Sequence, residues 1–286
     1  MKMLNSKIAA SLLVAVFMLF PSAGYPAESV AMITDVKGGV HLPGKTQNLA
    51  ILSYLSPGDE IILDAGAQLV VTYFSQSTEF GFKGPAQVVI QAQGAKALKG
   101  SAETRRLDSE KSGAGAKFVQ SGKLTFATVE MRALPLVKPT LQSPVNTRIS
   151  TLTPVFRWKE LEDVEKYSMT LMEESGKTIQ QVNLATSSWP MQANTALQYG
   201  ASYRWKVEAV LKSGDMLNSQ GGFSVADQAT ISRIAAQQPP ANASFSDQVA
   251  YALFLEAEDF RDDARRIWQE LAKQRPEDPN LKRRAR

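Results

Sequence analysis

The sequence predicts a mainly β protein that ends in a pair of helices, and three patterns carry this prediction. From Val30 to about Met131, short apolar or alternating runs are separated by turn signals. A second set of strand patterns runs from Thr140 to Val225. From Asp247 to Leu271 the apolar spacing becomes helical. We therefore expect a small β domain, a β-sandwich and a helical hairpin, in that order.

The first β domain is expected over residues 28–134, followed by a linker at 135–139. Turn signals such as Pro57-Gly58-Asp59 and Asp64-Ala65-Gly66 recur at short spacing within it. Gly94 to Lys117 has no clear period, which predicts a loop. The predicted strands are Val30–Ile33, Glu60–Leu63, Gln68–Phe74, Glu79–Phe82, Gln87–Ile90, Lys117–Val119 and Leu124–Val129.

Composition excludes several classes of chemistry. The chain has no cysteine, so disulfides, thiolate metal sites and Cys nucleophiles are impossible. His41 is the only histidine, which excludes metal sites built from a pair of histidines. The formal charge is +4, and Lys2 and Lys7 supply two of these charges. Without them the chain lies near +2, which argues against nucleic acid as a partner.

The first 27 residues have the layout of a signal peptide. Lys2 and Lys7 precede the apolar run Ile8–Phe20, and small residues follow it. We expect cleavage after Ala27, with Ala23 and Gly24 as alternatives because Tyr25 occupies a position that prefers a small residue. The apolar run is shorter than the roughly 20 residues that span a bilayer, which argues against a retained anchor. The sequence predicts a periplasmic or otherwise extracytoplasmic protein without a transmembrane segment after cleavage.

Two stretches of the first β domain resemble the FecR-type domain, a β-rich module of bacterial envelope proteins. They are Leu55–Val71, with Pro57-Gly58-Asp59 before a strand, and Phe82–Ile90, with Gly84-Pro85 before another. The resemblance covers about a third of the chain, and Ser75 to Thr78 depart from it where the family has an Asp-Gly turn. It implies a role in the envelope. Only seven residues precede the apolar run, which argues against a cytoplasmic regulatory segment of the kind that contacts a sigma factor.

The second domain is expected over residues 140–226. In Tyr203–Val210, aromatic and aliphatic residues alternate with charged ones, as in a strand with one buried face. Strand spacing suits a sandwich, and Trp158 and Trp205 are expected in its core. Phe156-Arg157-Trp158 and the stretch Leu197–Trp205 resemble a fibronectin type III domain, which implies an adaptor module.

Residues 227–246 are expected to be a linker that includes a helix, and residues 247–286 a helical hairpin with a basic tail. Positions Ala252, Leu255, Ala264, Trp268 and Pro276 resemble one tetratricopeptide repeat. A single repeat cannot bury its apolar face alone, so the hairpin must pack on a neighbouring domain or on a partner. The candidate partner-binding residues here are Leu253, Leu255, Phe260 and Trp268.

Gly39–Thr46 matches the phosphate-binding loop of nucleotide enzymes. That loop requires a preceding strand and a long following helix, whereas Pro57-Gly58 arrives about a dozen residues later. We therefore expect a hairpin loop and no nucleotide. His41 has no recognisable nucleophile or orienting carboxylate beside it. The carboxylates near the helical turn lack the spacing of a calcium loop and are expected to cap and solvate the helices. The set comprises Glu256, Glu258, Asp259, Asp262 and Asp263.

These features predict a protein that is not an enzyme and has no cofactor, no metal and no catalytic residues. The leading hypothesis is a bacterial envelope scaffold that binds a protein partner. One alternative is a periplasmic sensor in envelope signalling. The other is a module that binds peptidoglycan or another glycan, for which Trp189 and Tyr199 are the candidate contacts. The basic tail 282–286 would add contact to an anionic surface, although a solvated terminus is the simpler expectation.

Overall fold

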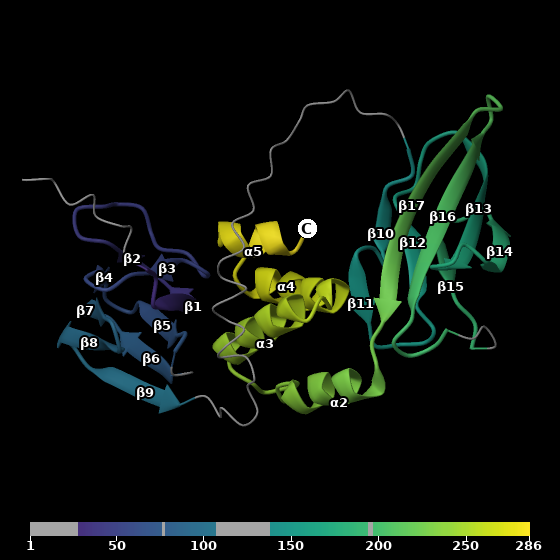
Figure 1. Ribbon diagram of the computed structural model, residues 1–286. Coiled ribbons are helices and arrows are strands. Elements are labelled where there is room, and N and C mark those ends of the chain that lie inside the picture. Colours follow the sequence, from purple (N-terminus) through teal and green to yellow (C-terminus); the bar gives the residue numbers. More distant parts are fainter. Residues whose placement is uncertain (1–27, 76–77, 107–137, 194–196) are drawn as a thin grey trace, which may run out of the picture.

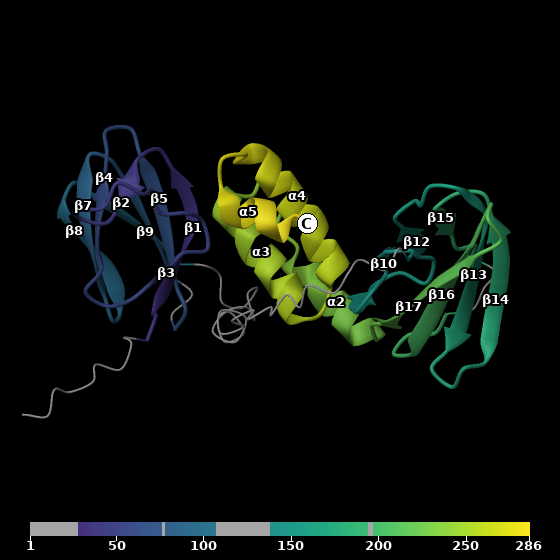
Figure 2. The ribbon, with the colours of Figure 1, turned by 90° about the horizontal axis from the view of Figure 1, so that it is seen from above.

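The computed structural model describes residues 28–75, 78–106, 138–193 and 197–286. It is mainly β, with four sheets, and its helices lie at the C-terminal end. The chain forms three units, namely the first β unit (28–106), the sandwich (138–226) and the helical unit (227–286). In Figures 1 and 2 the helical unit lies between the two β units. The order of the units in space therefore differs from their order in the sequence.

The first β unit packs two antiparallel sheets against each other. One sheet has the order β3-β1-β5-β6-β9 and the other β2-β4-β7-β8. Leu69, Val71 and Tyr73 alternate into the core between them, as the strand pattern predicts. The strands are β1 (Ala31–Lys37), β2 (Val40–His41), β3 (Tyr54–Leu55), β4 (Glu60–Leu63), β5 (Gln68–Tyr73), β6 (Thr78–Lys83), β7 (Ala86–Gln91), β8 (Gly94–Lys99) and β9 (Ala102–Arg106).

The loop predicted from Gly94 is wrong as far as Arg106, because this stretch forms β8 and β9. In β8 the inward positions are held by small residues such as Ala95, which give a weak apolar signal. In β9 every residue is exposed, so no alternation marks the strand. Backbone pairing of β9 with β6 holds it instead. The strands predicted at 117–119 and 124–129, and the first part of the linker, lie outside the described residues.

The sandwich joins a sheet of order β11-β17-β16-β13-β14 to one of order β10-β12-β15. Its aromatic core includes Trp158 and Trp205, as predicted, and also Phe156. Buried Trp205 donates its indole N–H to the carbonyl of Pro144 at 2.7 Å, so its polar atom is satisfied. The strands are β10 (Leu141–Ser143), β11 (Thr147–Ile149), β12 (Val155–Trp158), β13 (Val164–Glu173), β14 (Thr178–Leu184), β15 (Ser188–Pro190), β16 (Ser202–Leu211) and β17 (Met216–Val225).

Four helices make up the helical unit in the described part of the chain: α2 (Gln228–Gln237), α3 (Phe245–Ala257), α4 (Arg261–Gln274) and α5 (Pro279–Arg284). Side chains cap three of them. Asp227 caps α2, Ser244 forms a capping box with Asp247 on α3, and Asp278 caps α5. Helix α5 was not expected in the basic tail, yet Leu281 is fully buried there. Among the described residues no helix is long and apolar enough to cross a bilayer.

The apolar face of the helices packs on the chain itself, on the first β unit. Met32, Ile51 and Phe74 of that unit belong to one buried cluster with residues of α3, α4 and α5. Polar contacts surround this cluster. Asp278 accepts from the amide of Ile51 at 2.8 Å, and Arg275 donates to Asp35 at 3.0 Å. The apolar face of the repeat-like hairpin is therefore buried within the protein, against the first β unit.

Candidate interaction groove

The predicted partner-binding residues of the hairpin lie in the core that it shares with the first β unit. Leu253 is 5% exposed, and Leu255, Phe260 and Trp268 are 2% exposed or less. Trp268 donates its indole N–H to Glu256 at 2.8 Å. Of these four residues only Leu255 also lines an open surface.

That open surface is a groove of about 500 Å³ among α2, α3 and α4, called here the helical groove. Its apolar side chains come from all three helices, since α2 contributes Ile231 and Ile234, α3 Tyr251 and Leu255, and α4 Ile267. Within each helix the lining positions recur at spacings of three, four or seven residues, which places them on one face. The full lining is Ser150, Ile231, Ile234, Ala235, Gln238, Gln248, Tyr251, Leu255, Asp263, Arg266, Ile267 and Glu270.

The two sides of the helical groove differ in charge. On the α4 side, Asp263, Arg266 and Glu270 follow one another about one turn apart, with Arg266 bonded to Asp263. The α2 side carries no charged lining residue and ends in Gln238. Burial raises the pKa of the Tyr251 phenol, and the nearby Asp263 carboxylate adds to the rise. Tyr251 therefore remains a neutral hydrogen-bond donor at physiological pH.

Sequence reasoning missed the groove because α2 supplies one of its sides. The amphipathic spacing of Ile231, Ile234 and Ala235 in α2 is a signal that was available. What the sequence does not give is the position of α2 beside α3, which the short segment Gln238–Ala243 between them determines.

The two candidate glycan contacts differ in exposure. Trp189 is 7% exposed and stacks on Phe156, with 5.5 Å between the ring centroids, so it belongs to the sandwich core. Tyr199 is 49% exposed. The structure places no second exposed aromatic ring beside Tyr199 within the described residues.

The carboxylates near the α3–α4 turn are paired with arginines. Glu258, with a side chain 5% exposed, accepts two hydrogen bonds from Arg233 of α2 at 3.0 and 2.6 Å. Glu256 pairs with Arg284 of α5. Burial raises the pKa of Asp262, although hydrogen bonds from Ser143 and Arg265 oppose the rise. In the described part of the chain no group of His, Asp and Glu residues could hold a metal ion.

Gly39–Thr46 forms β2 and a turn, and the next element is strand β3 rather than a helix. The helix that would present backbone amides to a phosphate is therefore missing from this place. His41 lies 3.6 Å from Asp64, and the carboxylate is 61% exposed, so the pair is largely solvated.

Comparisons with known proteins place the chain in no family. A scan against protein-family models found no match, and a search of curated proteins found no relative. Among solved structures, CopC from Methylosinus trichosporium OB3b is 16% identical with a TM-score of 0.25, over 32% of this chain and 95% of CopC. The Clostridium perfringens spore cortex lytic enzyme SleM is 14% identical with a TM-score of 0.23, over 30% of this chain and 28% of SleM. Pectate lyase Pel3 from Pectobacterium carotovorum is 16% identical with a TM-score of 0.21, over 37% of this chain and 27% of Pel3.

Proposed function

We propose that this chain is a non-enzymatic, exported envelope protein that acts as an interaction scaffold. In this proposal the helical groove binds an amphipathic helix of a protein partner. The observation that carries the proposal is the groove itself, whose apolar side chains come from three helices, with Ile231, Tyr251 and Ile267 partly exposed along it. The resemblances to FecR-type, fibronectin type III and tetratricopeptide modules support a role of this kind.

Charge and shape favour a helix as the occupant. On α4 the groove is lined by Asp263, Arg266 and Glu270, which are three and four residues apart. A partner helix with complementary charges one turn apart would match this pattern. The opposite side is uncharged and contains the small residue Ala235, which leaves room for apolar partner side chains. An amphipathic helix with one apolar face and one charged edge meets both sides of the groove.

Photocrosslinking from α2 tests the proposal. Ala235 and Ala236 are adjacent exposed alanines, but only Ala235 lines the groove. A photoreactive amino acid at position 235 should give a specific protein adduct in intact cells, and the same group at position 236 should give little. With the purified partner, Ala235→Arg should weaken binding about tenfold or more, because it places a charge in a desolvated contact, while Ala236→Arg should not.

Two results would contradict the proposal. One is equal crosslinking from both positions, which would place the contact elsewhere. The other is salt-resistant sedimentation of residues 28–286 with purified cell-wall sacculi that is lost in Tyr199→Ala and unchanged in Ala235→Arg. That second result would assign the protein to glycan binding through the sandwich.

A further inference from the structure

A buried carboxylate in the first β unit depends on one arginine of an edge strand. The side chain of Glu79 on β6 is only 4% exposed. Arg105 on β9 donates to it from Nε at 3.0 Å and from Nη2 at 2.5 Å. Thr72 donates to its other oxygen at 3.3 Å, and the Thr72 hydroxyl bonds to that of Thr34 at 2.8 Å. Without Arg105, Glu79 would be a buried charge without its counterion, which is strongly destabilising.

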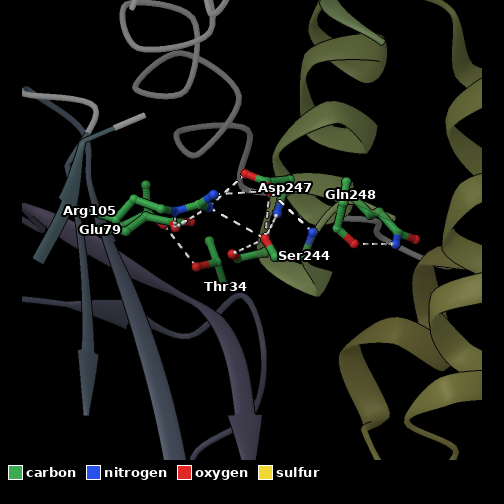
Figure 3. Close-up of polar contacts among 9 residues, drawn as sticks. Thr34, Glu79, Arg105, Ser244, Asp247 and Gln248 are labelled. Atoms are coloured by element: carbon green, nitrogen blue, oxygen red, sulfur yellow. Dashed lines mark hydrogen bonds and ion pairs between the residues drawn. The ribbon is translucent and has the colours of Figure 1, made fainter. Parts of the chain in front are cut away.

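The same guanidinium reaches across to the helical unit. Arg105 donates to both oxygens of Asp247 on α3, at 3.1 and 2.7 Å, and lies 3.4 Å from the hydroxyl of Ser244. Figure 3 shows Arg105 between Glu79 on one side and Asp247 with Ser244 on the other. Ser244 and Asp247 also form the capping box of α3. One side chain thus joins a buried strand residue to a helix N-terminus.

Within the described part of the chain, strand β9 has few other attachments. All five of its residues are exposed, and among the described strands it lies at the edge of its sheet with β6 as its one neighbour. An edge strand that buries no side chain is held mainly by its ladder of backbone hydrogen bonds and by its side-chain ion pairs. The ion pairs of Arg105 with Glu79 and Asp247 therefore contribute much of the side-chain interaction that holds β9 in place.

We propose that Arg105 couples the pairing of β9 to the docking of the helical unit on the first β unit, so that the two contacts open and close together. When β9 separates from β6, Asp247 loses its cation and the α3 N-terminus loosens. When the helices separate, Arg105 loses two of its acceptors and β9 loosens in turn. Thermodynamic linkage makes this coupling equal in both directions. The helical groove takes no part in this coupling.

Hydrogen exchange of the full chain tests the coupling. Arg105→Gln should speed exchange of the amides of β9 and of the first turn of α3 by roughly tenfold, because both carboxylates lose charge-assisted hydrogen bonds. The decisive variant is Asp247→Asn, which retains one acceptor oxygen for the capping box and removes the charge facing Arg105. It should also speed exchange in β9, on the other side of the junction.

Glu103→Gln is the matched control. Glu103 also lies on β9 and pairs with Lys83 of β6 at 3.1 Å, but both side chains are more than two-thirds exposed, and the bond between them lies within the first β unit. This variant should leave exchange in α3 unchanged. If Asp247→Asn speeds exchange in α3 alone and β9 stays as in the parent protein, the two contacts are independent and the proposal is wrong.

Discussion

Phe74 lies where the first β unit meets the helices. It directly follows β5, yet its side chain is 8% exposed and belongs to the cluster shared with α3, α4 and α5. The ring of Tyr54 packs against it with 6.1 Å between centroids. The stability of the junction therefore depends on a residue that the core of the first β unit itself does not include.

Phe74→Ala should lower the free energy of unfolding by about 3 kcal/mol or more, because it leaves a cavity between the two units. Urea denaturation followed by circular dichroism measures this loss. Tyr199→Ala is the control, since an exposed ring removed from the surface changes stability within about 0.5 kcal/mol. If Phe74→Ala changed the free energy of unfolding as little as Tyr199→Ala does, the packing of the helices on this ring would contribute little to stability.

At the scale of elements, two helix N-termini contact the β units through aspartates whose pKa values shift in opposite directions. Asp247 of α3 is partly buried, which alone would raise its pKa, but hydrogen bonds from Arg105 and Ser244 outweigh burial and lower it from 3.8. Asp262 of α4 has its pKa raised above 3.8 by burial at the sandwich, where Ser143 donates to it at 2.7 Å. The two junctions therefore respond oppositely to acid.

The two substitutions to Asn should have opposite pH dependence. Asp247 stabilises the fold above pH 3.8, and this contribution disappears as pH falls through its lowered pKa. Asp247→Asn should therefore lower the stability at neutral pH and have little effect on stability in acid. Asp262 stabilises the fold most below pH 3.8, and this contribution disappears as pH rises through its raised pKa. Asp262→Asn should therefore be harmless or stabilising at neutral pH and lose that advantage in acid. Urea titrations between pH 3 and 7 give both curves, and parallel curves would contradict the assignment.

About half of the described strands and the two main helices could be predicted from the sequence, because each of these carries its own apolar period. Tyr203–Ala209 alternates cleanly, and α4 has the helical spacing of Ala264, Trp268 and Leu271. Strand β9 and helix α5 could not, since β9 buries nothing and α5 buries chiefly Leu281. The sequence also could not decide whether Leu253 and Trp268 bind a partner or pack within the chain, because an apolar helix face does not reveal what covers it. The cluster that buries these residues includes Met32, more than 200 positions earlier in the sequence.

At the scale of the whole molecule, the cores differ in how far they depend on distant sequence. The aromatic core of the sandwich uses only residues of the sandwich. The core of the helical unit also requires Met32, Ile51 and Phe74. The contacts between the helices and the sandwich are more polar, with the Asp259 carbonyl accepting from the Arg148 amide at 2.7 Å and from the Thr147 hydroxyl at 3.1 Å.

We expect the fragment 138–226 to unfold cooperatively as an isolated domain, whereas the fragment 227–286 should lack fixed tertiary packing on its own. Near-ultraviolet circular dichroism and thermal melts of the two fragments measure this difference. Adding the fragment 28–106 to the helical fragment should restore packing of Trp268, visible in its fluorescence. A helical fragment that melts cooperatively alone would show that the first β unit is not required.

The position of the sandwich between the first β unit and the helices in the sequence determines the order in which the protein can be assembled. A chain that is made from its N-terminus presents Met32, Ile51 and Phe74 before the helices that cover them exist. The sandwich can complete its own core during that interval. Docking of the helical unit on the first β unit then joins residues separated by most of the chain. This step has the highest contact order, so we expect it to be the slowest. Until α5 with Leu281 has been made, the first β unit carries an exposed apolar surface to which a chaperone would bind.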